Sequence, residues 1–389
     1  MRTAAFSLLR LLPALLLAVP GIACAAFTWN LPEPVTPMAR DTYGVHNMFM
    51  VIIVTMFVVV FAVMLYSIAR HRKSIGAKPH PFTHPVRTWQ WVLVSVPFLI
   101  LAFIDFITIG IPSVHALVLM EDTKSRAEIL LKVTGMQWKW QYEYPDEGIR
   151  FVSTMSTTQD QIENREAKRP EYLLEVDNHV VLPVNRKVRV LLTSTDVIHT
   201  WWVPQFGVKR DAIPGFLRET WILIEKPGIY RGQCAELCGT GHAFMPVVVE
   251  AVSEPEYRAW IDKRKAEQAA SAAGAERTWS MDELMKAGQE VYAKQCAVCH
   301  QANGQGLPPA FPGLVGSKLV TGPLLAPDGK LLKDGHVDRV LNGKPGTAMP
   351  PFRDTLSDSD LAAVITYERN AFGNKQGDMI QPAQIKALR

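Results

Sequence analysis

The sequence has 389 residues, of which 48% are hydrophobic and 20% are charged, and its formal net charge is +4. At roughly 100–200 residues a domain, this length allows two or three domains, and the composition excludes a disordered or fibrous chain. The small net charge gives no case for nucleic acid as a partner. The five cysteines are too few for a disulfide scaffold, and four of them form two closely spaced pairs, which indicates metal or cofactor chemistry.

Residues 1–25 have the features of an export signal. Arg2 and Arg10 supply positive charge, residues 11–19 form a short apolar stretch, and Cys24 lies between alanines that suit cleavage. Two interpretations of Cys24 remain open. It is either discarded with the signal or is the lipid-accepting first residue of a mature lipoprotein.

Two apolar runs follow, at residues 48–69 and 89–111. Each is long enough to cross a bilayer as a helix that rises about 1.5 Å per residue. The connection between them contains the basic run Arg-His-Arg-Lys at 70–73 and is therefore expected on the cytoplasmic side. We predict a transmembrane helix hairpin over residues 26–118, in contact with membrane lipid, and an exported remainder of the chain.

Short runs of β type begin after the second apolar segment. Such runs occur at 171–176, 187–192, 219–224 and 246–250, and Pro, Gly, Asn and Asp clusters separate them. This pattern predicts an all-β sandwich or small barrel for a domain at residues 119–254.

The side chains that can bind metal gather near the ends of these runs. They are His199, Cys234, Glu236, Cys238, His242 and Met245. Two thiolates, two imidazoles and a thioether are soft-to-borderline ligands that suit copper, and the second cysteine leaves enough ligands for two sulfur-bridged ions. A disulfide between the two cysteines is an alternative in an oxidising compartment, and zinc is another, although structural zinc rarely uses methionine.

These residues resemble the binuclear copper A motif of cytochrome c oxidase subunit II. The similarity includes Gly-Met-Gln-Trp-Lys-Trp at 135–140 and Thr-Asp-Val-Ile-His at 195–199, and it covers roughly residues 27–252. The resemblance implies a cupredoxin-like domain in which Cys234 and Cys238 bridge the coppers. His199 and His242 become terminal imidazole ligands, and Met245 becomes a thioether ligand.

The resemblance also implies that Glu236 binds copper through its backbone carbonyl and a magnesium ion, shared with subunit I, through its carboxylate. Trp138 resembles the aromatic residue through which electrons enter. The sequence departs from the family at Lys139, where many relatives carry Tyr, and at Gln90, where a Glu near a proton path is usual. The surface that receives electrons and the uptake of protons are therefore expected to differ.

Residues 255–277 are predicted to be a linker. A charged, helix-like run leads into an Ala-rich segment, which we expect to be partly helical and partly flexible. After it, Ser-Met-Asp-Glu at 280–283 resembles a capping box that opens a helix.

The sequence Cys-Ala-Val-Cys-His at 296–300 is the attachment signature of c-type haem. Cys296 and Cys299 can bond both vinyl groups of one porphyrin, and His300 can reach the iron. Met349 can serve as the sixth ligand, since a His/Met pair suits electron transfer at high potential. A redox disulfide or a metal knuckle is the alternative. Residues 278–389 resemble a small, all-α class I cytochrome c.

The resemblance as a whole implies subunit II of a caa-type, proton-pumping cytochrome c oxidase of the bacterial inner membrane, with its copper and haem domains on the periplasmic side. Electrons would pass from a soluble or membrane cytochrome c through haem c and copper A to the haem–copper centre of subunit I, which reduces oxygen to water. Subunits I and III are the expected partners. A copper A subunit of a nitric oxide reductase and a membrane-tethered electron carrier are the alternatives, and the partner subunit distinguishes them.

Overall fold

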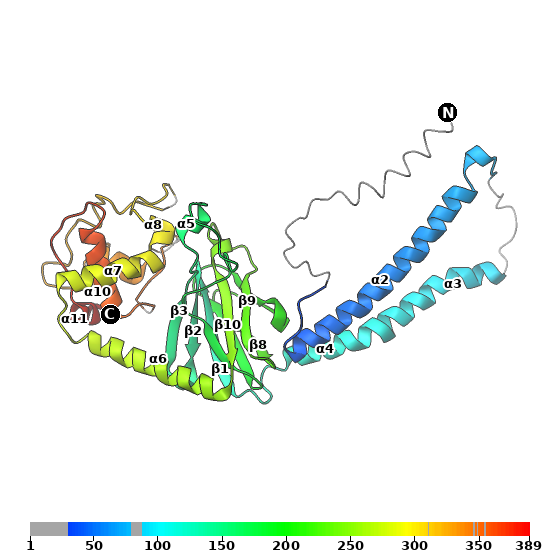
Figure 1. Cartoon of the computed structure of the whole chain (residues 1–389), viewed down its shortest axis with the longest axis horizontal. Coiled ribbons are helices and arrows are strands. Elements are labelled where there is room, and N and C mark those ends of the chain that lie inside the picture. Colours follow the sequence, from blue (N-terminus) through cyan, green and yellow to red (C-terminus); the bar gives the residue numbers. More distant parts are fainter. Residues whose placement is uncertain (1–29, 79–87, 310, 345–346, 348, 354) are drawn as a thin grey trace. The chain divides into compact units, whose positions relative to one another are not determined.

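The computed structural model describes residues 30–78, 88–309, 311–344, 347, 349–353 and 355–389 (Figure 1). The chain divides into two units, Met1–Glu33 and Pro34–Arg389. The predicted export signal and Cys24 lie outside the described residues.

Two long apolar helical segments follow Pro34. The first is α2 (Pro37–Arg70), and the Thr36 hydroxyl caps its start by accepting a hydrogen bond from the Ala39 amide at 3.0 Å. After the turn η1 (Lys73–Ile75), the second consists of α3 (Thr88–Phe103), the π-helical η2 (Ile104–Gly110) and α4 (Ile111–Glu121). Both segments are long and apolar enough to cross a membrane. The two predicted helices are thus confirmed, and α2 begins well before residue 48.

The middle of the chain folds into two five-stranded sheets (Figure 1). The first has the order β3 (Ile149–Ser153), β2 (Lys139–Tyr144), β1 (Ile129–Met136), β5 (Lys187–Ser194) and β8 (Arg218–Leu223). The second has the order β4 (Val180–Pro183), β10 (Pro246–Val252), β9 (Gly228–Cys234), β6 (His199–Val203) and β7 (Val208–Ala212). Short helical elements connect the strands, namely η3 (Pro145–Glu147), α5 (Gln159–Ile162), η4 (Pro204–Phe206) and η5 (His242–Phe244).

The inner faces of both sheets form one hydrophobic core. Trp140 of the first sheet and Trp201 of the second are fully buried, and the Trp201 indole N–H donates to the Tyr142 hydroxyl at 3.2 Å. This buried bond joins the two sheets and satisfies two polar groups that would otherwise be unpaired. The predicted all-β sandwich is confirmed.

One predicted strand, at 171–176, is wrong. Its first half makes local turns, with backbone hydrogen bonds from the Tyr172 amide to the Arg169 carbonyl and from the Leu174 amide to the Glu171 carbonyl. Leu173 has a φ of 62°, in the left-handed region, so the segment turns and cannot continue as a strand. Only Val176 pairs, in an isolated bridge to Met155.

The predicted linker contains one continuous helix, α6 (Glu254–Gly274), in place of a partly flexible segment. Its start carries a capping box between Ser253 and Glu256. Tyr257 and Ile261 are buried in the core of the sandwich, and Trp260 packs on Tyr144 at 5.3 Å between ring centroids. The first half of α6 therefore belongs physically to the β domain. The sequence-based domain boundaries themselves remain predictions.

A second hydrophobic core lies among the C-terminal helices. These are α7 (Met281–Gln295), α8 (Ala297–His300), α9 (His336–Asn342), α10 (Asp358–Asn370) and α11 (Pro382–Leu388). The capping box predicted at Ser280 is confirmed. Helices α7 and α10 cross closely at Gly288, where a Cβ would lie 2.2 Å from the Ala363 carbonyl oxygen. Only glycine allows this approach, which closes an all-α domain as predicted.

Candidate metal centre

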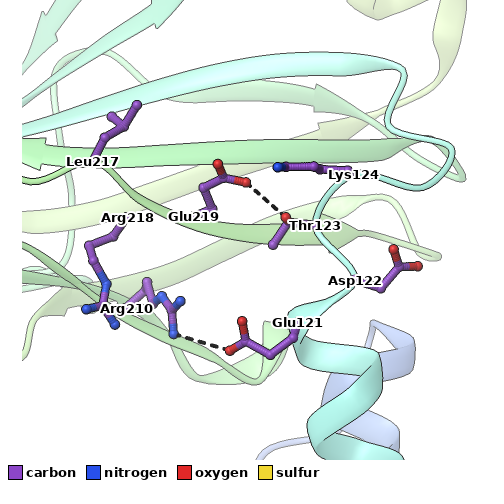
Figure 2. A pocket seen from close by; sticks show the side chains of 8 residues that line it. All are labelled: Glu121, Asp122, Thr123, Lys124, Arg210, Leu217, Arg218 and Glu219. Atoms are coloured by element: carbon purple, nitrogen blue, oxygen red, sulfur yellow. Dashed lines mark hydrogen bonds and ion pairs between the residues drawn. The ribbon is translucent and has the colours of Figure 1, made fainter.

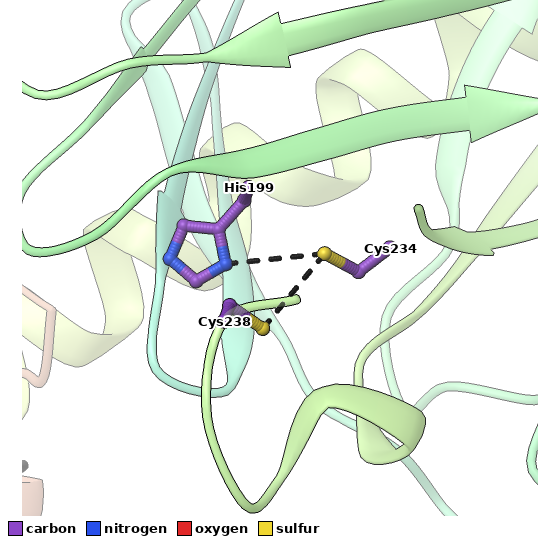
Figure 3. Close-up of side chains that lie close together, drawn as sticks. All are labelled: His199, Cys234 and Cys238. Atoms are coloured by element: carbon purple, nitrogen blue, oxygen red, sulfur yellow. Dashed lines mark hydrogen bonds between the residues drawn. The ribbon is translucent and has the colours of Figure 1, made fainter. Parts of the chain in front are cut away.

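Three of the predicted ligands lie together at the end of the second sheet (Figure 3). His199 begins β6, Cys234 ends β9, and Cys238 follows in the next loop. The two sulfurs are 3.9 Å apart, and the Cys234 sulfur is 4.0 Å from His199 Nδ1. All three side chains are buried, and both thiols are free. The structure thus brings the two cysteines together as thiols, without the alternative disulfide.

The remaining predicted ligands join this cluster. The Cys238 sulfur lies 3.5 Å from both His242 Nδ1 and Met245 Sδ. The Glu236 backbone carbonyl oxygen lies 3.3 Å from the Cys234 sulfur. This convergence follows from strand pairing, because β9 runs antiparallel to both β6 and β10 and the Cys234 amide donates to the Met245 carbonyl at 3.1 Å.

The pKa values of the two thiols are shifted in opposite directions. A hydrogen bond from Cys238, with smaller contributions from His199 and nearby backbone groups, lowers the pKa of Cys234 to about 3. The pKa of Cys238 is raised, because its thiol donates to Cys234 and a second charge would lie beside the first. Two thiolates this close therefore need a bound cation. Together with two imidazoles and a thioether, they fit copper better than any other common metal.

Asp196 orients His199 and was missed as a site residue in the sequence. His199 Nε2 donates to the Asp196 carboxylate at 2.8 Å, which leaves Nδ1 directed at Cys234. Burial lowers the pKa of His199, but the bonds to Asp196 and Cys234 outweigh it and raise the pKa overall. Carboxylates of this kind commonly support metal-binding histidines. The spacing of three residues between Asp196 and His199 is the signal that could have found it.

Trp138 lies in the connection between β1 and β2 and contacts the loop that carries the cysteines. Its indole N–H donates to the Cys238 carbonyl at 3.1 Å, and the Gln137 side-chain amide donates to the same oxygen at 2.8 Å. A Cβ on Gly241 would lie 2.2 Å from the Trp138 ring, so the close stacking of ring and loop requires glycine. Trp138 is thus bonded directly to the backbone of a candidate ligand and is only half-buried.

In the helical domain, a backbone contact orients the His300 ring. Its Nδ1 lies 2.8 Å from the Pro312 carbonyl, which can only accept, so Nδ1 carries the proton and Nε2 keeps its lone pair. Met349 packs, with Cys296, against the second core. These residues fit a haem bound between His300 and Met349.

The cysteines of this domain are kept neutral. Burial raises the pKa of Cys299 to about 11 and that of Cys296 well above its ordinary value. A metal knuckle requires thiolates, whereas the thioether bonds of c-type haem leave the sulfurs uncharged. The Cys-Ala-Val-Cys-His order, with His300 adjacent to the second cysteine, favours haem attachment over a metal knuckle.

A pocket of about 430 Å³ lies where α4 joins the β domain, and charged and polar residues line it (Figure 2). Across it, Arg210 lies 3.8 Å from Glu121, and the Thr123 hydroxyl donates to Glu219 at 2.9 Å. None of its lining residues belongs to the copper or haem clusters. Several of its charged groups are paired, Arg210 with Glu121 across the pocket and Glu219 with Arg189 beside it.

Comparison with known proteins gives matches to both domains. Residues 129–252 match the family model described as cytochrome c oxidase subunit II, periplasmic domain, and residues 283–367 match that of cytochrome c oxidase, cbb3-type, subunit III. Cytochrome c oxidase subunit 2 of Cereibacter sphaeroides is 38% identical over 245 residues, which cover 59% of this chain and 78% of that protein. Cytochrome c oxidase subunit 2 of Oncopeltus fasciatus is 43% identical over 178 residues, which cover 46% of this chain and 73% of that protein.

Among solved structures, the chain is similar to the periplasmic domain of cytochrome oxidase subunit II of Bradyrhizobium japonicum. The identity is 46%, the match covers 36% of this chain and 96% of the other, and the TM-score is 0.33.

The fold and the two clusters define a membrane-anchored electron-transfer protein with a copper-binding β domain and a haem-binding cytochrome c domain. The chain belongs to the cytochrome c oxidase subunit II family.

Proposed function

We propose that this chain is the electron-input subunit of a proton-pumping cytochrome c oxidase in a bacterial inner membrane, assembled with subunits I and III. The observation that supports this most strongly is the convergence of two thiols, two imidazoles and a thioether at one end of a β-sandwich. A haem-binding domain in the same chain supplies a second redox group. The electron donor is a soluble or membrane-bound cytochrome c.

Cys234 and Cys238, together with His199, His242, Met245 and the Glu236 carbonyl, would hold the copper. Bound copper would supply a one-electron carrier at this site, and haem c would supply a second one in the cytochrome domain. Asp196 keeps His199 in the tautomer that presents Nδ1. His199, Cys234, Cys238 and Met245 are buried, so little reorganisation is expected around them when the charge on the site changes.

Trp138 is the residue through which electrons reach the copper site. Its hydrogen bond to the Cys238 carbonyl connects the aromatic ring to a bridging ligand through one short contact. Its ring is half-buried and therefore accessible from outside the copper loop.

The Glu236 carboxylate would bind magnesium, whereas its backbone carbonyl would bind copper. Glu236 is exposed while its carbonyl faces the Cys234 sulfur. An exposed carboxylate beside the copper site is available for a magnesium ion shared with subunit I, because magnesium prefers oxygen ligands.

Purification from native membranes, followed by metal analysis, haem spectra and identification of co-purified subunits, tests this function. We expect two coppers and one haem c per chain, and a polytopic partner containing a haem–copper site. A partner with a haem–iron site would indicate a nitric oxide reductase. Purification without any haem-containing partner would indicate a tethered carrier.

A further inference from the structure

Lys139, the first residue of β2, is buried although lysine is among the residues that proteins bury least. Only 5% of its surface is exposed. Within the described residues, groups of the cytochrome domain contact its ammonium. Gln295 Oε1 accepts a hydrogen bond from Nζ at 3.3 Å, and the ring of Phe352 lies 4.1 Å from Nζ. Because Gln295 directly precedes Cys296, the lysine lies beside the haem-attachment sequence.

The neighbouring Trp138 also contacts the cytochrome domain. Its ring meets that of Phe311 edge to face, with the centroids 6.1 Å apart and the planes at 88°. Phe311 precedes Pro312, whose carbonyl accepts from His300. A continuous series of contacts therefore runs from the Cys238 carbonyl through Trp138 and Phe311 to the residue that fixes the haem-binding histidine.

We propose that Trp138 and Lys139 form a docking surface for the chain's own cytochrome domain, and that the buried ammonium keeps this docking weak enough to reverse. The inference rests on the proposed function and identifies the partner of the surface at which electrons arrive. While the domains are docked, an external donor cannot reach Trp138 and must deliver its electron to the cytochrome domain.

The two residues act in opposite directions. The edge-to-face pair of Trp138 and Phe311 is of a kind that contributes about 0.5–1.5 kcal/mol beyond buried area. Burial of the ammonium opposes docking, because desolvation of an ion costs several kcal/mol and a neutral amide and one ring offset it only in part. Consistent with this, burial lowers the pKa of Lys139 to about 8.

Weak docking is sufficient in a tethered system. A covalent connection holds the two surfaces at an effective concentration on the order of millimolar, so a contact of modest strength is still well populated. Reversible release then lets the cytochrome domain meet a donor and return.

Amine labelling of the full chain, loaded with copper and haem, tests the docking. Lys132 is the matched control, because it lies in the same sheet and its side chain is 36% exposed. We expect Lys139 to react at least about tenfold more slowly than Lys132, since reaction requires the docked domain to open. Equal rates would overturn the proposal.

The role of the ammonium is tested by hydroxyl-radical oxidation of Phe352 in variants of the full chain. Lys139→Met should lower Phe352 oxidation because docking tightens, and Lys139→Glu should raise it. Lys132→Met should leave it unchanged. Unaltered oxidation in both Lys139 variants would overturn the proposed role of the charge.

Flash-induced transfer from haem c to copper, measured in the same samples, separates this inference from the proposed function. Protection of Lys139 without electron transfer to copper would leave the docking standing and refute the function. Rapid transfer with Lys139 fully reactive would support the function and refute the docking.

Discussion

The two cysteine pairs of this chain have similar spacing but opposite surroundings. In the β domain, the hydrogen bond from Cys238 and the neighbouring His199 lower the pKa of Cys234 well below its ordinary value. In the cytochrome domain, burial keeps Cys296 and Cys299 protonated. The first environment stabilises charge and suits a metal, whereas the second excludes charge and suits carbon–sulfur bonds to a porphyrin. The structure around a cysteine pair, more than its spacing, thus determines its chemistry.

The largest predicted effect comes from breaking one pair at a time. Cys238→Ser should abolish copper binding and leave haem c in place, because a single thiolate cannot bridge two coppers and the haem depends on another core. Cys299→Ser is the reciprocal variant and should weaken haem attachment while copper stays. Spin-resonance and visible spectra report both centres. A mixed-valence copper signal that persists in Cys238→Ser would contradict the assignment.

The next effect concerns the axial ligand of the haem. Met349→Leu should lower the haem reduction potential by on the order of 0.1 V and allow carbon monoxide to bind, because the thioether ligand is lost. Redox titration and carbon monoxide difference spectra measure this. Met379→Leu, at an exposed methionine of the same domain, is the control and should change neither property. An unchanged potential in Met349→Leu would mean that another residue is the sixth ligand.

Asp196→Asn tests how far the copper site depends on support from outside its ligands. The amide retains the size but loses the charge that orients and polarises His199, so copper affinity should fall about 10–100-fold. Competition with a copper chelator provides the measurement. Asp160→Asn removes an exposed, ion-paired carboxylate at a distant position and serves as the control. Equal affinities in the two variants would show that Asp196 has no such role.

The smallest effect is the pH dependence of docking through Lys139. Its pKa lies at about 8 when docked, below the ordinary 10.5, because burial outweighs the smaller opposing effects of Cys296, Cys299, Asp177 and Asp196. The undocked state therefore binds the proton more readily, and protonation opposes docking. Docking should tighten as the pH rises from about 8 to 10.5. Below about 8, the full cost of burying the charged ammonium opposes docking. When Cys296 and Cys299 form thioether bonds, they no longer raise the pKa of Lys139, so the lower end of this pH range moves down.

Oxidation of Phe352 by hydroxyl radicals, measured across this pH range, checks the prediction. It should fall with rising pH in the wild type and stay flat in Lys139→Met, which has no ammonium to titrate. The same slope in both proteins would assign the pH dependence to other groups.

The sequence alone determined the parts of the molecule that depend on local pattern. Apolar length predicted the two membrane helices, short β-type runs separated by turn residues predicted the sandwich, and Cys-Ala-Val-Cys-His predicted the haem. Capping at Ser280 was also readable, because a capping box involves only four consecutive residues. The pattern failed at 171–176, where residues of β type form a turn around Leu173, whose φ of 62° lies in the left-handed region.

Only the tertiary structure decided the features that join residues distant in sequence. Sheet pairing places His199, at the start of β6, beside Cys234, at the end of β9. The burial of Lys139 beneath Gln295 and Phe352 has no sequence signature, because a lysine in a strand is expected to be exposed to solvent. Burial and charge depend on what the whole fold packs around a side chain, and for that reason local sequence could name the ligands but could not describe their surroundings.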